Sequence, residues 1–168
     1  MHYQAPFGRA TLLITLFSSL LMVALPIVLL VLIPVALFSL AAISLMIPIA
    51  ILLACFWYRV TGYQLDSREL TIKRLVFDFI IPLDEIESVE FDQTAMKRSL
   101  RMFGNGGLFG FYGYFRNDRY GSFRAFVTDS QNVVVIKTSE KIFMVSPDKP
   151  EKFVNKLNDL LAKKNAKK

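Results

Sequence analysis

The sequence predicts a helical hairpin in a membrane, followed by a small β domain that ends in one amphipathic helix. Three observations support this fold class. The stretch from Ala10 to Tyr58 has no charged residue, and the residues after Arg59 alternate between apolar and polar side chains. After Ser146 the apolar residues take up a helical spacing instead. One membrane unit and one small folded domain account for the 168 residues.

The apolar stretch from Ala10 to Tyr58 is 49 residues long. One helix of that length would far exceed a hydrocarbon core of about 30 Å. Two crossings need roughly 40 residues and leave a few for a turn. We therefore expect a transmembrane hairpin over residues 10–58, with spans near 10–33 and 35–57 and a turn around Pro34.

Basic residues flank the expected hairpin on both sides, whereas its turn has none. Arg9 precedes it, and Arg59 and Arg68 follow it. The positive-inside rule then places residues 1–9 and the chain after the hairpin in the cytoplasm. The spans carry no Asp, Glu, Lys or Arg, which argues against a transporter or channel, because such proteins normally need buried charge in the membrane.

Small residues recur at a spacing of four in both spans. They are Thr11, Thr15 and Ser19 in the first span, and Ala50 and Ala54 in the second. Small faces let two helices approach closely. We favour an interface between the two spans, because a hairpin needs an internal interface. The alternative is an interface with a partner protein or with a second copy of the chain, which would make a homo-oligomer.

Seven short stretches after the hairpin have the alternation or the composition of β-strands. Turns rich in Asp, Ser, Asn and Gly separate several of them. This number and spacing indicate a small barrel or a sandwich. The predicted strands cover residues 60–65, 70–76, 79–81, 86–91, 122–127, 133–137 and 141–145.

The last part of the domain reads as a helix. Asp148 is the expected N-cap, Pro150 falls in the first turn and Glu151 lies at N3. An apolar stripe follows, and we expect it to cover an open end of the β domain. The stripe consists of Phe153, Val154, Leu157, Leu160 and Leu161. The domain then spans residues 59–162, and residues 163–168 form a basic tail.

The most unusual segment runs from Arg101 to Tyr120, where five glycines alternate with aromatic residues. Glycine at this density favours tight turns, close backbone approach and mobility, and it does not make a rigid core. We interpret the segment as a loop outside the core and as the interaction surface. A plain solvated loop is the alternative. The expected surface residues are Lys97, Arg98, Arg101, Phe103, Phe109, Phe111, Tyr112, Tyr114, Arg116 and Arg119.

Four stretches resemble the bacterial pleckstrin homology (PH)-like domain proteins of the membrane-anchored type, which have two N-terminal transmembrane helices. They read YQLDSRELTIKR, IPLDEIESVE, RMFGNGGLFGFYGYF and VVVIKTSEKIFMVSPDKPEKFVNKL. The resemblance implies a PH-like seven-stranded barrel capped by a C-terminal α-helix. It implies no catalytic activity and identifies no ligand residues.

Residues that could support catalysis or bind a metal are scarce. His2 is the only histidine and Cys55 the only cysteine, too few for a His or Cys metal site. The run Gly104-Asn105-Gly106-Gly107 lacks the Lys-Ser/Thr of a phosphate-binding loop. Neither Ser99 nor Ser146 has an evident histidine partner. We expect no enzyme, no cofactor and no metal.

The net charge of +6 is modest and fits a surface beside anionic lipid better than a nucleic-acid groove. We expect a binding or scaffolding module in the bacterial cytoplasmic (inner) membrane, multi-pass, with both termini cytoplasmic and a protein as partner. Binding of anionic lipid headgroups is the alternative. A regulatory subunit of a membrane complex is a third interpretation. We expect no nucleic acid as partner.

Overall fold

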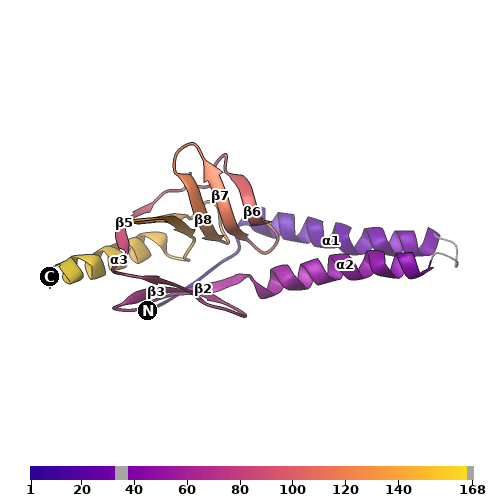
Figure 1. Cartoon of the computed structure of the whole chain (residues 1–168), viewed down its shortest axis with the longest axis horizontal. Helices are drawn as coiled ribbons and strands as arrows, with labels where there is room; N and C mark the ends of the chain where they lie inside the picture. Colours follow the sequence, from indigo (N-terminus) through magenta and orange to yellow (C-terminus); the bar gives the residue numbers. More distant parts are fainter. Residues whose placement is uncertain (33–37, 166–168) are drawn as a thin grey trace.

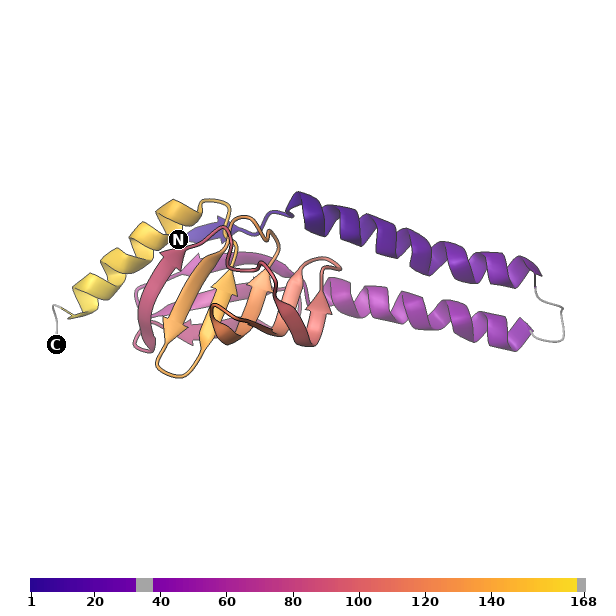
Figure 2. The ribbon, with the colours of Figure 1, turned by 90° about the horizontal axis from the view of Figure 1, so that it is seen from above.

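The computed structural model describes residues 1–32 and 38–165. Two long helices project side by side from one end of a domain built from two β-sheets (Figure 1, Figure 2). The first strand and the last helix both belong to the domain. The two long helices are therefore an insertion between the first and second strands of one folded unit.

The described part of the chain contains ten strands and three helices. All seven strands expected from the sequence are present within a residue or two of their predicted bounds, and β1, β6 and β7 are additional. In chain order the elements are β1 (His2–Gln4), α1 (Arg9–Leu32), α2 (Phe38–Trp57), β2 (Val60–Leu65), β3 (Glu69–Arg74), β4 (Phe79–Pro82), β5 (Ile86–Phe91), β6 (Leu100–Gly106), β7 (Phe111–Asn117), β8 (Gly121–Val127), β9 (Val134–Thr138), β10 (Ile142–Val145) and α3 (Pro150–Asn165).

The strands form two sheets that do not close into the expected barrel. The first sheet has the order β1-β2-β3-β4, and the second has the order β5-β9-β10-β8-β7-β6. All pairs are antiparallel except β8 and β10. The unexpected strands β7 and β6 extend the second sheet beyond β8. The outer side of β8 is therefore paired within the second sheet, and β6 forms the edge of that sheet.

The N-terminal segment is part of the domain. β1 pairs with β2, with Tyr3 opposite Tyr63. The Tyr3 ring lies edge-on to Phe153 of α3, with ring centroids 5.1 Å apart. We expected the domain to begin at residue 59, but the structure adds residues 2–4 to it. A three-residue strand is too short for alternation to reveal it.

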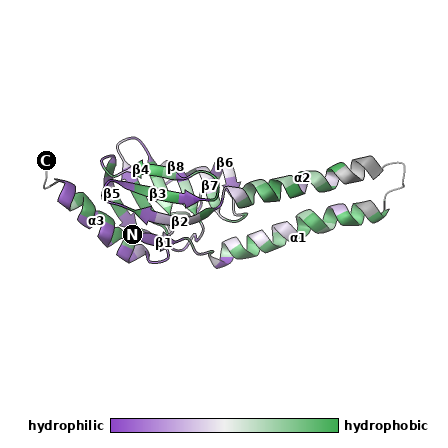
Figure 3. Cartoon of the chain, turned by 90° about the horizontal axis from the view of Figure 1, so that it is seen from below, coloured by the Kyte–Doolittle hydropathy of each residue, from purple (hydrophilic) through white to green (hydrophobic). Residues whose placement is uncertain are grey.

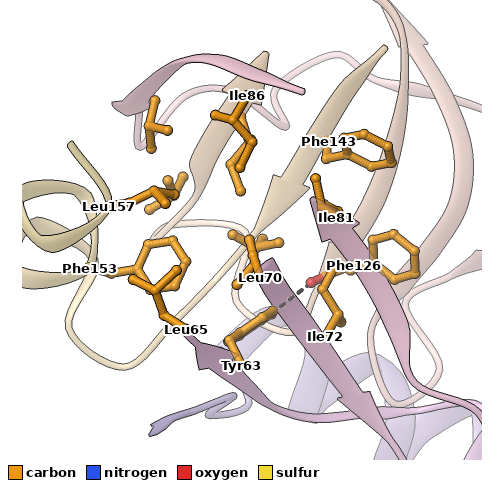
Figure 4. Packing of buried hydrophobic residues seen from close by; sticks show 14 of the residues in the cluster. Tyr63, Leu65, Leu70, Ile72, Ile81, Ile86, Phe126, Phe143, Phe153 and Leu157 are labelled. Carbon is orange, nitrogen blue, oxygen red and sulfur yellow. Dashed lines mark hydrogen bonds between the residues drawn. The ribbon is translucent and has the colours of Figure 1, made fainter. Parts of the chain in front are cut away.

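The main core lies between the two sheets and under α3 (Figure 4). Tyr63 and Leu70 contribute from the first sheet and Phe126 from the second. Phe153 and Leu157 of α3 are both fully buried against them. The apolar stripe predicted for this helix is therefore confirmed as a packing face, and α3 covers one end of the space between the sheets.

A buried polar network connects the two sheets near the end of β10. The Tyr63 hydroxyl donates to the Phe126 carbonyl at 2.7 Å and accepts from the Ser146 amide at 3.0 Å. The Ser146 hydroxyl in turn accepts from the Thr128 amide at 2.8 Å. Burial raises the pKa of Tyr63 to about 12, even though its bonds to Ser146 act in the opposite direction. Ser146 thus has a structural role in the core.

The start of α3 differs from the prediction by one residue. The Phe153 amide donates to the Lys149 carbonyl at 2.9 Å, which places the N-cap at Lys149 and not at Asp148. The Asp148 carboxylate instead accepts from the Gln4 amide at 3.2 Å, and the Asp148 amide donates to the Gln4 carbonyl at 3.0 Å. The contact with β1, which the sequence did not reveal, takes Asp148 away from the capping position.

The two long helices are apolar around their circumference and largely exposed, unlike α3 (Figure 3). Within the described residues, only Arg9–Leu29 is long and apolar enough to cross a membrane by length and composition. The apolar part of α2, Ile43–Trp57, is shorter. The structure therefore has one candidate membrane helix where we expected a two-span hairpin. The predicted turn around Pro34 lies outside the described residues.

Candidate functional site

The segment that we expected to be a mobile loop is a β-hairpin. β6 and β7 pair along their length, with Gly104 opposite Gly113. Both glycines have positive φ, 110° and 127°. A Cβ on Gly113 would lie 2.2 Å from the Phe103 carbonyl oxygen. These glycines therefore allow the two strands to pair at close approach. The prediction of a loop outside the sheet is wrong, and it was made because glycine-rich sequences are typical of loops.

The tip of the hairpin is hydrogen-bonded to both long helices. The Phe109 amide donates to the Thr15 hydroxyl of α1 at 2.8 Å. The Tyr112 hydroxyl donates to the Cys55 carbonyl of α2 at 2.7 Å. That carbonyl lies in the last turn of α2, where backbone acceptors lack helical partners. Thr15, which we expected in an interface between spans, thus contacts the domain.

Side-chain packing strengthens the same junction. The Phe109 ring lies edge-on to Phe56 of α2, with centroids 5.7 Å apart. The guanidinium of Arg59 covers the Phe56 ring at 4.2 Å. A Cβ on Gly107 would lie 3.0 Å from the Ile14 side chain, so α1 touches the hairpin backbone. The hairpin tip is therefore joined to both long helices by packing as well as by hydrogen bonds.

A cleft of about 840 Å³ lies between the helix pair and the β6–β7 hairpin. Its helical walls come from one face of α1, including Ile14 and Met22, and from the last turns of α2, including Ile51. Its domain wall is aromatic and basic. The basic residues are Arg74 of β3, Arg101 of β6 and Arg124 of β8.

Two of these arginines lie over the same aromatic ring, that of Phe126. The Arg124 guanidinium lies 4.3 Å from the Phe79 ring centroid and 5.1 Å from that of Phe126. Arg74 lies over the same Phe126 ring at 5.8 Å. Burial, and next the nearby charge of Arg124, lower the pKa of Arg74. The cleft therefore concentrates positive charge close to its aromatic wall.

The aromatic residues predicted for the surface divide between three environments. Phe109 and Tyr112 contact the helices, and Tyr112 is only 9% exposed. Phe111 packs beside Phe115 in the second core cluster. Phe103 is 75% exposed on β6, and Tyr114 is exposed on β7. Phe103, Tyr112 and Tyr114 nevertheless line the cleft together, so the structure brings part of the predicted aromatic surface to one site.

The predicted basic residues are also separated. Only Arg101 lines the cleft. Arg116, near the end of β7, pairs in register with Leu100, at the end of the hairpin away from the tip. Arg119 forms an ion pair with Asp92 at 2.7 Å in the neighbouring turns. Lys97 and Arg98 precede β6 at that same end and are exposed.

Arg74 and Arg124 of the cleft were not predicted from the sequence. They are 50 residues apart and reach the cleft from different sheets. One local signal was available for Arg124, because it interrupts the otherwise apolar run Phe123–Val127 of a predicted strand. No local signal distinguishes Arg74 from the other basic residues near it.

β6 is an edge strand of the second sheet, and its free edge carries large apolar side chains. Leu100 is 71% exposed and Met102 is 64% exposed, and Phe103 continues the patch. Exposed apolar edge strands are uncommon, because they invite pairing with another strand. This edge is therefore a second candidate surface, and it adjoins the cleft because Phe103 also lines the cleft.

Family comparison agrees with this architecture. A family model described as a bacterial PH domain matches residues 61–161, from β2 to α3. The chain belongs to the bacterial PH domain family. A second bacterial PH domain model matches residues 11–104, so it includes the helix pair together with the first strands. No curated protein and no solved structure matches this bacterial PH domain protein.

Proposed function

We propose that this bacterial PH domain protein is a non-enzymatic binding module anchored in the cytoplasmic membrane, with its domain in the cytoplasm. The observation that carries the proposal is the insertion of the helix pair between β1 and β2. Because these strands pair, with Tyr3 opposite Tyr63, both ends of the helix pair must lie on the same side of the membrane. The basic residues Arg9 and Arg59 favour the cytoplasm as that side.

The junction supports a scaffolding role. Hydrogen bonds from the hairpin tip to Thr15 and Cys55 fix the domain relative to the helices. A domain that is attached to membrane helices by such contacts presents its surfaces at a constant height above the bilayer. A flexible linker would instead let the domain sample many orientations.

The partner surface that we propose is the free edge of β6. Its backbone groups are available for pairing, and Leu100, Met102 and Phe103 provide apolar contacts along it. This combination fits a protein partner that adds an extended strand to the sheet. Main-chain pairing would give affinity, and the side chains would give specificity.

Topology is the first test. Alkaline phosphatase is fused after Lys168, and a cysteine is placed at His2 in a Cys55→Ser background. We expect no phosphatase activity and no labelling by an impermeant maleimide in intact cells. Activity or labelling at either end would overturn the cytoplasmic assignment. Opposite sides for the two ends would contradict the β1–β2 pairing in the membrane.

Partner binding is tested by a photo-crosslinking amino acid placed at Met102 in the full chain in native membranes. We expect a discrete protein adduct that Leu100→Lys reduces strongly. The matched control is the same probe at Ile80, which is exposed on β4 of the other sheet. No protein adduct at Met102, or equal adducts from both positions, would refute the β6 surface.

A further inference from the structure

The cleft between the helix pair and the hairpin has an excess of positive charge. Arg74, Arg101 and Arg124 reach it from three strands, and none of the described residues that line it is acidic. The ion pairs found in the described part of the chain all involve other residues. None of the three guanidiniums therefore forms an ion pair with a carboxylate of the described residues, although the charge of Asp78 acts on Arg74 from nearby.

Two of these charges also oppose each other. Arg74 and Arg124 lie over the same Phe126 ring. Part of the resulting cost is visible in the lowered pKa of Arg74, for which burial is the first cause and Arg124 the second. A bound anion would remove this repulsion, because it would interact favourably with both guanidiniums.

The opposite wall of the cleft is apolar and extends along the helices. Ile14, Ser18 and Met22 follow one another at a spacing of four on α1, which covers about 12 Å at 1.5 Å per residue. Ile51 and Ala54 of α2 line the cleft as well. The cleft therefore continues from the basic domain wall into the helical region that contains the candidate span.

We propose that this cleft binds one anionic phospholipid from the membrane. Its phosphate contacts Arg101 and Arg124, with Arg74 behind them, and an acyl chain lies along the Ile14–Met22 face of α1. The inference rests on the membrane anchoring proposed above, but it does not depend on a protein partner at β6.

The dimensions and chemistry of the cleft fit this ligand. A volume of about 840 Å³ lies in the upper part of the usual range for small-molecule sites, about 300–1,000 Å³. Guanidinium groups match phosphate oxygens in a bidentate geometry. A zwitterionic headgroup would bring an ammonium group into the same positive field, so an anionic headgroup should be preferred.

The experiment uses the full chain purified in a neutral detergent, with lipid retention measured by native mass spectrometry. The probes are dioleoyl phosphatidylglycerol and dioleoyl phosphatidylcholine at equal concentration. We expect one phosphatidylglycerol per chain, retained at least about tenfold better than phosphatidylcholine, a preference of about 1.4 kcal/mol. Equal retention of the two lipids would overturn the proposal.

Charge-removing variants distinguish lipid binding in the cleft from nonspecific electrostatic attraction. Arg101→Gln/Arg124→Gln should abolish the preference for phosphatidylglycerol. The matched control Lys97→Gln/Arg116→Gln removes the same charge from exposed residues outside the cleft lining and should leave the preference unchanged. Equal losses from both pairs would mean nonspecific attraction. Should the first pair lower the melting temperature, Arg101→Gln alone, at an exposed position, replaces it.

The placement of the acyl chain is tested by Ala54→Phe, which puts a ring into the helical part of the cleft without altering charge. It should abolish lipid retention, and normal retention would refute the acyl-chain placement. Inorganic phosphate as competitor distinguishes a lipid from a free anion, since displacement at the same concentration would favour the free anion. Lipid retention in detergent does not depend on the orientation of the protein in the membrane. If both termini are cytoplasmic but no lipid is retained, only the proposed lipid site is refuted. If lipid is retained normally but the termini are not cytoplasmic, only the proposed cytoplasmic location is refuted.

Discussion

The tip and the free edge of the β6–β7 hairpin have similar residues in opposite environments. At the tip, Phe109 and Tyr112 pack against the long helices. On the edge, Met102 and Phe103 are exposed. The two regions lie only a few residues apart, and both combine glycine with aromatic side chains. The comparison shows that the role of an aromatic residue here depends on what lies opposite it in space.

The largest effect should come from the glycines that hold the hairpin together. Gly113→Ala would place a Cβ 2.2 Å from the Phe103 carbonyl oxygen at a φ of 127°, so we expect a loss of about 3 kcal/mol or more. Chemical denaturation of the purified full chain measures it. Gly121→Ala is the control, because its φ is 65° and nothing lies within 4 Å. A loss of only about 1 kcal/mol is expected there, and equal losses would contradict the close-approach argument.

Removing the packing at the tip should have the next largest effect. Phe109 is half-buried against Phe56, so Phe109→Ala should cost about 2 kcal/mol, less than a fully buried ring. Hydrogen exchange at the start of α1 should become faster, because the junction loosens. A double-mutant cycle with Phe56→Ala should give a coupling of about 0.5–1.5 kcal/mol. Absence of coupling would mean that the two rings do not meet.

The Tyr112 hydroxyl should contribute less than the Phe109 ring. Tyr112→Phe removes the bonds to the Cys55 and Leu108 carbonyls, which is worth about 1 kcal/mol. Tyr114→Phe removes an exposed phenol and should change the free energy of unfolding little. If both variants lose the same stability, the hydroxyl does not hold the helix end.

The same residue predicts a pH dependence. Burial raises the pKa of Tyr112, so the folded state keeps its proton above the unfolded pKa of about 10. The contribution of this buried, protonated phenol to the free energy of unfolding is fully present below a pH of about 10. It is lost as the pH rises through the pKa of Tyr112 in the folded state. Denaturation midpoints should therefore fall above pH of about 10, and Tyr112→Phe should make the fall less steep. Part of the fall should remain in Tyr112→Phe, because burial also raises the pKa of Tyr63, to about 12. Identical slopes for both proteins would contradict the assignment.

Replacing edge residues should change stability least. Met102→Ser/Phe103→Ser affects exposed side chains, so the free energy of unfolding should change by less than about 0.5 kcal/mol. The protein adduct expected from a probe at Leu100 should nevertheless disappear. A stability loss as large as that of Phe109→Ala would show that the edge is structural, and the comparison between tip and edge would fail.

Local patterns predicted the elements whose signals are local. The strand β5 was predicted from its alternation, and α3 from the spacing of Phe153 and Leu157, because each periodicity reports the burial of one face. β1 is too short for such a pattern. β6 and β7 were missed because the pairing of Gly104 with Gly113 is a contact between strands, and the composition of each strand by itself favours a loop.

The sequence by itself determined that a long apolar stretch precedes a small β domain with a C-terminal amphipathic helix, because hydropathy and periodicity follow from neighbouring residues. Only the tertiary structure decided that β1 joins β2 across the helix pair and that Tyr112 bonds to Cys55. It also brought Arg74, Arg101 and Arg124 to one cleft. These residues are far apart along the chain, and their proximity depends on how the sheets and helices pack, which no local pattern records.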